Sequence, residues 1–268
     1  YGPTARWLRR HWYNPWRVSS AGAEAIADAW REAQPDCQGE PEWVSPLMQR
    51  AERVKKVYRS RQQIDYARLQ AYVTRQQERW QHLEAEKHRL RLQTVRPLYR
   101  RLHPSRHLES LQGVGQDSAA IYVAFIGDIQ RFPSLRQFRG WTGMVPYSRQ
   151  TGQTQAQGLR LTQAGPDLIK ATAYRNAEVA RPWDPQIATV YYRQMMKYGK
   201  HHLQAVCACA TDLPNRIYAI LRDQRPYELR NVDGTPVSKK EARRICLTEY
   251  RVPDEVRKRR NHRDRDRR

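Results

Sequence analysis

The sequence has no long hydrophobic run. None of its apolar stretches approaches the ~18 residues that a membrane-spanning helix requires, and the first ten residues contain no apolar core of a signal peptide. Acidic residues are also scarce, because 27 Asp and Glu stand against 49 Lys and Arg, which leaves a formal charge of +22. This surplus argues against an ordinary metabolic enzyme. It favours a polyanionic partner, and we expect nucleic acid and no membrane.

Cysteine is rare as well. Two of the four cysteines, Cys207 and Cys209, are two residues apart, which is not the CxxC spacing of zinc or redox sites. They lie in the apolar stretch 203–210, so we expect small buried residues there and predict no metal site in this chain. The cysteine usage agrees with a reducing compartment, and we expect a cytoplasmic protein associated with the nucleoid.

Glycine and proline are absent from residues 47–96. Charged residues and Gln dominate this segment, and its apolar residues recur at helical spacing. We predict a coiled-coil-like helical arm, bent near Ser60–Gln63, and homo-oligomers formed through Leu47–Arg96, because so polar a helix needs a partner. The apolar positions are Val54, Val57, Ile64, Leu69, Tyr72, Trp80 and Leu83.

The remaining patterns predict an all-α chain, mostly helical, in three parts. Residues 1–105 form a helical region with the arm, residues 106–224 form a compact helical domain, and residues 225–268 form a basic C-terminal tail. Frequent glycines in the middle part indicate short helices and tight turns, and Pro214 breaks a helix that otherwise spans 201–221.

The first thirty residues interleave aromatic and basic side chains. One interpretation is base stacking combined with phosphate contacts. The other, which we favour, is a small helical core with a basic outer face. The aromatic residues are Trp7, Trp12, Tyr13, Trp16 and Trp30, and the basic ones are Arg6, Arg9, Arg10 and Arg17.

A helix-hairpin-helix pattern covers residues 108–121. Leu108 and Leu111 bury the first helix, and Gly113 and Gly115 allow a tight hairpin that can approach a phosphate closely. Val114 anchors the hairpin in the core, and Ala119 allows close helix packing. The second helix begins near Gln116, so its free N–H groups form an anion site that grips the DNA backbone without reading sequence. The alternative is a tight turn without a ligand.

The segment that follows carries further motifs in order. It reads IGDIQRF at 126–132, WTGMVP at 141–146 and Thr151-Gly152, followed by Gly158, by Gly165 with Lys170, and by 191–200. Together with the hairpin, these features resemble the transposase domain of the insertion-sequence transposases described as bridge-RNA-guided recombinases. The resemblance covers about Leu108–Leu221, and it implies that the protein acts on DNA with a structured guide RNA.

The resemblance also implies a nucleophile. In this family a Ser beside a Gly attacks a DNA phosphodiester, and this chain has Thr151 at that place, with Ser148 as the alternative hydroxyl. The β-branch of Thr151 restricts its rotamers. No His or carboxylate lies near either hydroxyl in the sequence, while Arg149, Arg160 and Lys170 can stabilise developing phosphate charge.

Basic and aromatic residues are mixed around this segment. Phe138, Trp141 and Tyr147 lie between its arginines, a mixture that suits single-stranded or distorted nucleic acid. The tail at 257–268 adds affinity that does not depend on sequence. The predicted DNA-binding residues are Gly113, Val114, Gly115, Arg136, Arg139, Arg149, Arg160 and Lys170, and Arg131 belongs to the same basic rim.

The resemblance further implies an N-terminal RuvC-type domain whose acidic residues bind divalent metal. Residues 1–105 show no alternating strand pattern, and their acidic residues, such as Asp28, Asp36 and Asp65, are scattered. We therefore expect this chain to hold the arm and the transposase domain without the metal-binding half. It then has no cofactor of its own and is inactive alone.

Two other functions remain open on the sequence. The chain can be a non-catalytic nucleic-acid-binding module built on the hairpin and the basic tail, which binds with a steep salt dependence and cleaves nothing. It can also be a structural protein that dimerises through 47–96 and whose charge serves solubility only.

Overall fold

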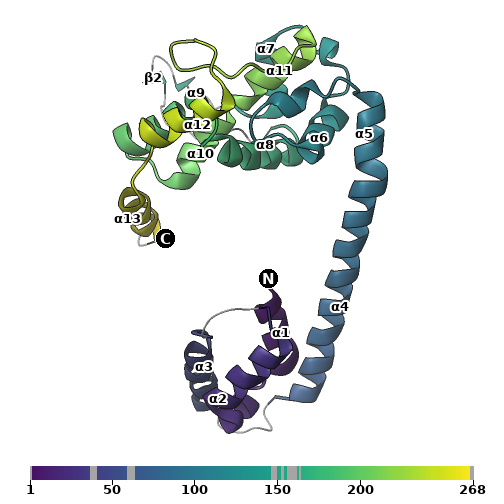
Figure 1. Ribbon diagram of the computed structural model, residues 1–268, viewed down its shortest axis with the longest axis vertical. Coiled ribbons are helices and arrows are strands. Elements are labelled where there is room, and N and C mark those ends of the chain that lie inside the picture. Colours follow the sequence, from purple (N-terminus) through teal and green to yellow (C-terminus); the bar gives the residue numbers. More distant parts are fainter. Residues whose placement is uncertain are drawn as a thin grey trace. The chain divides into compact units, whose positions relative to one another are not determined.

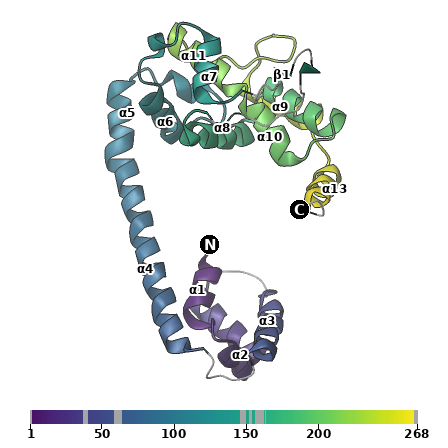
Figure 2. The same cartoon turned by 180° about the vertical axis from the view of Figure 1, so that it is seen from behind.

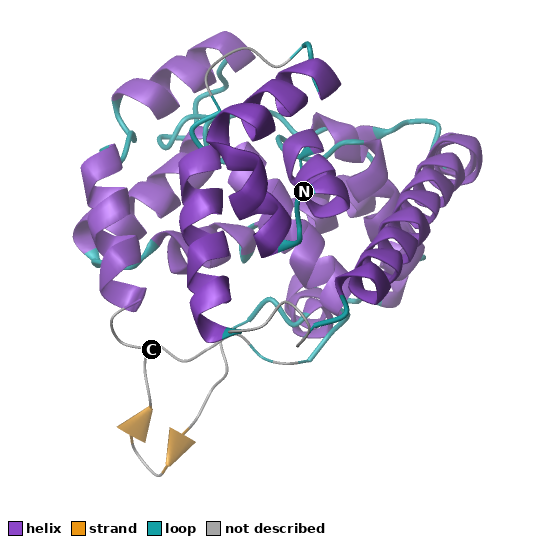
Figure 3. Cartoon of the chain, turned by 90° about the horizontal axis from the view of Figure 1, so that it is seen from below, coloured by secondary structure: helices purple, strands orange, loops and turns teal. Residues whose placement is uncertain are grey.

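The computed structural model describes residues 2–36, 41–58, 64–145, 150–151, 154–155, 162 and 164–265. Helices make up almost all of the regular structure (Figure 3), so the predicted all-α class is confirmed. The described strands are β1 (Gln150–Thr151) and β2 (Thr154–Gln155), an antiparallel pair in which Gln150 opposes Gln155. Among the residues that the structure describes, no helix is both long and apolar enough to cross a membrane. The chain divides into two compact units, residues 1–89 and 90–268.

The first unit is built from four helices (Figure 1), of which α2 and α3 pack closely against each other. Their buried residues, Val18 and Ile26 from α2 and Val44 and Ala51 from α3, form a small core. The side chain of Asn14 caps α2 by accepting hydrogen bonds from two backbone N–H groups. The helices are α1 (Pro3–His11), α2 (Pro15–Ala33), α3 (Val44–Val57) and α4 (Tyr66–Leu90).

Tryptophans extend this small core. Trp30 is buried and meets the ring of Trp43 edge-on with centroids 5.8 Å apart. The Trp7 ring lies 6.3 Å from Trp43 and 6.2 Å from Trp12. Edge-to-face pairs at these distances are favourable. The interpretation of the N-terminal aromatics as a helical core is therefore confirmed for Trp7, Trp12 and Trp30.

The predicted arm is only partly correct. Residues 44–57 belong to α3, which buries Val44 and Ala51 against α2, so they are not part of an exposed arm. A long helix begins at Tyr66 and runs without interruption through 102 (Figures 1 and 2): α4 passes through the π-helical turn η2 (Arg91–Val95) into α5 (Arg96–Leu102). No residue of α4 is buried. The predicted bend at 60–63 lies outside the described residues.

After α5, the second unit continues as short helices joined by tight turns, as the glycine pattern predicts. The predicted break at Pro214 is confirmed, because α10 ends at Ala210 and Pro214 lies in the first turn of α11. The elements are η3 (His107–Ser110), α6 (Gln116–Ile126), η4 (Ile129–Arg131), α7 (Leu135–Thr142), α8 (Asp167–Ala180), α9 (Pro185–Tyr192), η5 (Arg193–Lys197), α10 (His202–Ala210), α11 (Leu213–Asp223), α12 (Lys239–Thr248) and α13 (Asp254–Arg265).

Helix α8 lies at the centre of this unit. It packs against α6 on one side and α10 on another, and its buried positions are mainly small residues such as Ala173, Ala177 and Ala180. Near the C-terminus, α12 packs on α9, and the ring of Trp183 is covered by the guanidinium of Arg243 at 3.9 Å. The segment 225–268 thus contributes helices that pack on the folded unit.

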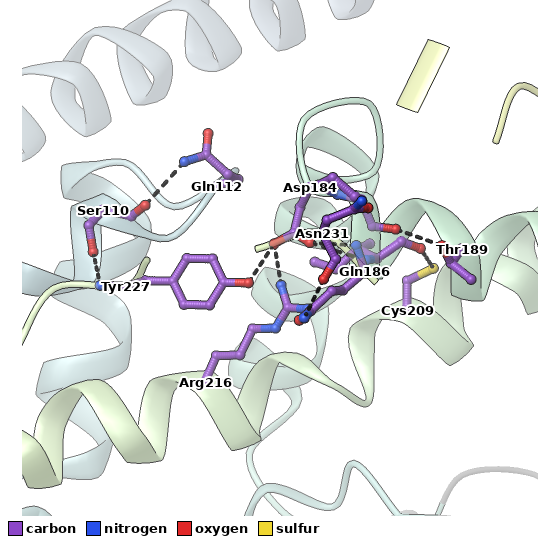
Figure 4. A network of polar contacts seen from close by, with 11 residues as sticks. Ser110, Gln112, Asp184, Gln186, Thr189, Cys209, Arg216, Tyr227 and Asn231 are labelled. Atoms are coloured by element: carbon purple, nitrogen blue, oxygen red, sulfur yellow. Dashed lines mark hydrogen bonds and ion pairs between the residues drawn. The ribbon is translucent and has the colours of Figure 1, made fainter. Parts of the chain in front are cut away.

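A buried carboxylate connects several of these elements (Figure 4). Asp184 has no exposed surface, and its Oδ1 accepts hydrogen bonds from the backbone N–H groups of Gln186 and Ile187 at the start of α9. Its Oδ2 pairs with the guanidinium of Arg216 from α11 and accepts from the Tyr227 hydroxyl at 2.9 Å. Removing a carboxylate from water is costly, and these four donors offset that cost.

The buried pair of Asp184 and Arg216 predicts that a single substitution will strongly lower the free energy of unfolding. Asp184→Asn keeps the side-chain volume but leaves the Arg216 charge without its partner, so we expect the free energy of unfolding to fall by about 3–5 kcal/mol. Urea unfolding of the full chain, followed by circular dichroism, measures the loss. Asp223→Asn is the control, because Asp223 pairs with Arg222 at the surface and its loss should have a much smaller effect. Equal losses in both variants would contradict the role of Asp184.

Candidate nucleic-acid interface and reaction loop

The predicted hairpin folds as a turn between two helical segments. Leu108 and Leu111 are buried, as expected, although the first segment, η3, is a single 3₁₀ turn. Gly113 has φ +82°, and a Cβ there would lie 2.3 Å from the backbone oxygen of Asn176 in α8. A side chain would therefore collide with backbone. Close packing against α8 explains glycine at 113 without any ligand.

The start of α6 is the exposed part of the hairpin. Val114 is buried and anchors the turn, whereas Gly115 is exposed and caps the helix with extended backbone and no side-chain hydrogen bond. In the first turn, Asp117 accepts two hydrogen bonds from Arg96, at 2.8 and 3.0 Å. These bonds keep the pKa of Asp117 below its usual range.

Arginines of the preceding helix surround this helix start, which the sequence analysis did not single out. Arg91 lies 3.6 Å from the Asp117 carboxylate, and Arg100 donates to the side chain of Gln116 at 2.9 Å. Arg91 and Arg96 thus face the single carboxylate of Asp117, and Arg100 lies beside the adjacent Gln116, so positive charge gathers beside the N–H groups at the start of α6. The four-residue spacing of Arg96 and Arg100, just before the hairpin, was the available signal.

A second feature is a loop closed by two glycines. Gly143 ends α7 with φ +68°, and a Cβ there would lie 1.8 Å from the backbone oxygen of Ala164. Gly165 has φ +79°, and its Cβ would lie 2.5 Å from the backbone oxygen of Trp141. The two chain segments thus cross with no space for a side chain. They form the base of the loop that contains β1 and β2.

Hydrogen bonds hold this base together. The backbone N–H of Thr162 donates to the carbonyl of Val145 at 3.0 Å, and its hydroxyl donates to the carbonyl of Gly143 at 3.1 Å. Lys170, at the start of α8, donates to the carbonyl of Ala164 at 3.1 Å and pairs with Asp167 at 2.9 Å. Lys170 therefore lies at the loop base, next to the segment predicted to react.

The predicted hydroxyl residues belong to this loop. The backbone of Thr151 lies in β1, which pairs with β2 through Thr154. Ser148, Arg149 and Arg160 lie outside the described residues, as do Tyr147, Gly152, Gly158 and Gln163. The structure thus places the backbone of Thr151 in a hairpin whose base is fixed on α7 and α8.

The arginines and aromatic residues predicted to surround the loop lie in different environments. Arg136 is exposed on α7, whereas Arg131 lies over the rings of Phe132 at 4.6 Å and Trp141 at 5.0 Å. Phe138 is 1% exposed and packs among these rings, so the expectation that it stacks on nucleic acid is wrong. It instead fills the core, because it lies on the buried face of α7.

Arg139 occupies an intermediate position at the rim. Its Nε atom is buried and has no hydrogen-bond partner among the described residues, while the side chain as a whole is half-buried. Arg139 therefore differs from Arg136: part of its guanidinium is buried without a hydrogen-bond acceptor among the described residues, whereas the Arg136 side chain extends into solvent. Of the predicted cationic residues, Arg136, Arg139 and Lys170 are therefore on described elements that border the loop.

Helix α8 separates the hairpin from the loop base. Gly113 packs near Asn176, whereas the loop base meets the first turn of α8 at Asp167. Nine residues of α-helix at 1.5 Å each place these two points about 14 Å apart. The structure thus brings together the residues of each feature, but it does not bring the hairpin glycines and the loop base into one site.

The side chains that commonly bind metals are dispersed in the described part of the chain. Within the residues that the structure describes, no three His, Cys, Asp or Glu side chains are grouped so that they can hold a metal ion. Cys209 and Cys246 are buried, and burial raises the pKa of each thiol to about 12, so neither is a ready thiolate ligand. The donor set for a divalent cation therefore does not exist in the described part of this chain.

This chain is similar in sequence to proteins of bacterial insertion elements. Residues 105–192 match the family described as "Transposase IS116/IS110/IS902 family". An uncharacterized protein of insertion element IS110 from Streptomyces coelicolor is 31% identical over 137 residues, which cover 51% of this chain and 33% of that protein. An uncharacterized protein of insertion element IS900 from Mycobacterium paratuberculosis is 33% identical over 131 residues, or 47% of this chain and 32% of that protein.

The matched region is thus about a third of the length of these relatives. The family match includes the hairpin, α6, α7, the loop with β1 and β2, and α8. The hairpin turn, α6 and the loop therefore belong to the segment that matches this family, whereas Arg91, Arg96 and Arg100 precede it.

The close crossing at the loop base predicts that alanine substitutions at three nearby glycines change the free energy of unfolding differently. Gly143→Ala or Gly165→Ala introduces a Cβ into backbone at positive φ, so we expect each to lower the free energy of unfolding by more than ~1 kcal/mol. Hydrogen exchange of the Thr162 amide should also accelerate. Gly140→Ala is the control, since Gly140 lies in α7 with open space at its Cβ, and alanine should stabilise the helix by about 0.5–1 kcal/mol. Similar behaviour of all three variants would refute the close crossing.

Proposed function

We propose that the chain works in DNA transposition as the transposase-domain part of an insertion-sequence transposase, because residues 105–192 match the IS116/IS110/IS902 transposase family. The observation that carries the proposal is the crossing of Gly143 and Gly165 at the base of the loop, because the resemblance assigns the nucleophile to Thr151 within this loop. The domain then binds a DNA strand and presents a hydroxyl to its backbone.

The proposed reaction is a phosphoryl transfer to Thr151. Its Oγ attacks a DNA phosphorus, an ester bond forms between Oγ and phosphorus, and the bond from phosphorus to the leaving deoxyribose oxygen breaks. The proton of the Thr151 hydroxyl is released, and the leaving oxygen gains one to become a free hydroxyl. Lys170 at the loop base, with Arg149 and Arg160 from the loop itself, offsets the charge that develops on phosphate. Ser148 is the second candidate nucleophile.

The hairpin would hold the DNA backbone. The N–H groups at the start of α6, next to exposed Gly115, can donate hydrogen bonds to a phosphate oxygen, and Arg91, Arg96 and Arg100 supply charge around it. Asp117 is already neutralised by Arg96, so it does not prevent an anion from approaching. Arg136 and Arg139 extend this positive surface toward the loop.

A guide RNA and self-association complete the proposal. The charge of +22 exceeds what one short DNA contact uses, and it supports a second polyanion such as a structured RNA. On α4, large apolar side chains are exposed, among them Leu69, Leu83 and Leu90. Their exposure supports homo-oligomers formed through this part of Leu47–Arg96.

We also propose that the chain needs a RuvC-type domain with its divalent metal for activity. We expect the ligands of that metal to come from the RuvC-type domain, since among the described residues of this chain no three metal-binding side chains are grouped. Action on DNA in bacterial insertion elements fits a cytoplasmic, nucleoid-associated location.

A non-catalytic nucleic-acid-binding module is the second candidate function. It is favoured by the distance of about 14 Å between the hairpin and the loop base along α8, because the hairpin with its arginines is a complete anion site without the loop. Under this alternative the chain binds nucleic acid but forms no covalent intermediate.

The nucleophile can be tested by trapping. We expect the chain, incubated with donor DNA, guide RNA and a metal-loaded RuvC-type domain supplied in trans, to form a protein–DNA adduct that resists denaturation. Thr151→Ala should abolish the adduct, whereas Thr151→Ser should keep or increase it, because serine lacks the β-branch that crowds the attack. Denaturing gel electrophoresis with labelled DNA measures the yield.

Ser148→Ala is the matched control and should leave the adduct unchanged. An adduct that persists in Thr151→Ala and disappears in Ser148→Ala would transfer the role to Ser148. No adduct in any arm, with DNA binding intact, would favour the non-catalytic module.

The hairpin contact can be tested by its salt dependence. Duplex DNA binding should weaken strongly between about 50 and 200 mM salt, because the phosphate contacts release counterions. Arg100→Gln should weaken binding to all sequences alike and reduce the slope of log affinity against log salt by about 1. Arg222→Gln is the control, since Arg222 is an exposed arginine of α11 that is already paired with Asp223. Fluorescence anisotropy measures both, and an affinity that does not change with salt would reject the electrostatic contact.

A further inference from the structure

The first unit contains a groove that the transposase domain does not explain. It lies between α1 and α4, entirely within residues 6–81, and has a volume of about 430 Å³, within the range of ligand sites. Its surface is mostly apolar. The residues that matter for the argument are Arg6, Arg9, Tyr13, Tyr72, Gln77 and Trp80.

Hydrogen bonds hold the two walls of this groove in place. The Gln77 side-chain amide donates to the carbonyl of Arg6 at 3.3 Å, and the Tyr13 hydroxyl donates to the carbonyl of Tyr66 at 2.7 Å. The Tyr13 hydroxyl also lies 3.1 Å from the side chain of Gln70. The groove is therefore preformed by contacts between side chains of one helix and backbone of the other, and a ligand need not assemble it.

Aromatic rings on the α4 wall are open to solvent. Trp80 is 45% exposed and Tyr72 is 61% exposed, which is unusual for residues of this size in a segment with a nearby core. The Arg6 guanidinium lies 5.9 Å from the centre of the Trp80 ring. A planar group that stacks on Trp80 would therefore have a cation beside it.

The residues that line the groove carry charge of one sign. No carboxylate lines it, and α1 carries Arg6, Arg9 and Arg10 without any acidic residue. A second copy of α4 is a poor occupant, because that helix has five Lys and Arg against three Glu and would bring like charge toward α1. Exposed rings flanked by arginines instead match a ligand with flat bases and a phosphate backbone.

We propose that the groove between α1 and α4 binds single-stranded nucleic acid, with a base stacked on Trp80 or Tyr72 and the adjoining phosphates held by Arg6 and Arg9. Duplex nucleic acid does not fit this mode, because its bases are already stacked and their faces are covered. Either ribose or deoxyribose is compatible, since stacking uses only the base. The proposal does not depend on the chemistry of Thr151, which belongs to the other unit.

The experiment compares single-stranded and duplex binding in the full chain. Labelled oligo(dT), oligo(U) and a duplex of equal length are titrated by fluorescence anisotropy at ~200 mM salt, where general phosphate contacts are weakened. We expect Trp80→Ala to weaken single-strand binding about tenfold and to leave duplex binding unchanged. Trp80→Phe keeps a ring and should lose less. A loss with oligo(dT), oligo(U) or both supports the groove and identifies the sugar it accepts.

Two control variants make the outcome specific. Arg6→Gln should reduce single-strand affinity and the salt slope, whereas Arg79→Gln removes the same charge from α4 outside the groove and should change single-strand binding less. Leu83→Ala tests the exposed apolar surface of α4 without touching the groove. Circular dichroism confirms that each variant folds.

Certain results would overturn the proposal. Unchanged single-strand binding in Trp80→Ala would do so, as would equal losses in Arg6→Gln and Arg79→Gln. Sedimentation is run in parallel, and a dimer that becomes a monomer in Trp80→Ala would show that a second copy fills the groove. Failure of this test leaves the Thr151 adduct experiment unaffected, because the adduct is measured on the loop of the other unit.

Discussion

The close approach of backbones around α8 is the constraint on which the 90–268 unit depends. Gly113 packs where any Cβ would meet the Asn176 carbonyl at 2.3 Å, and the small residues Ala173 and Ala177 let α6 and α10 come near. The first turn of the same helix holds the loop base through Lys170. A larger side chain at the hairpin would therefore separate the helices that also support the loop, since packed interiors transmit small displacements.

The positive charge is less available than its total indicates. Many arginines are used inside the fold: Arg216 pairs with buried Asp184, Arg131 covers two aromatic rings, and Arg181 both pairs with a carboxylate and lies 4.5 Å from the centre of the Tyr191 ring. Arginine suits these places because its guanidinium is flat and donates in several directions. The charge that we propose meets a polyanion lies at the start of α6, beside the loop and in the groove of the first unit.

The proposed binding and reacting features occupy opposite ends of α8. About 14 Å of helix separates the point where Gly113 packs on α8 from the loop base at the start of α8, so we expect the hairpin and the loop to contact different phosphates of one strand. If the proposed function is correct, the strand must run along the domain from the hairpin to the loop. Binding and chemistry then depend on different contacts, which explains how one can persist without the other.

The sequence by itself determined the helical class, the break at Pro214 and the burial of Leu108, Leu111 and Val114, because these follow from local periodicity and backbone preferences. It misplaced the start of the arm, since only the packing of α3 on α2 shows that residues 44–57 are covered, and it misjudged Phe138 for the same reason. Tertiary structure alone decided the Asp184–Arg216 pair, the crossing of Gly143 with Gly165, and the groove beside Trp80. Each of these features joins residues that are distant in the chain. A local sequence pattern does not indicate which distant residues will be in contact after folding.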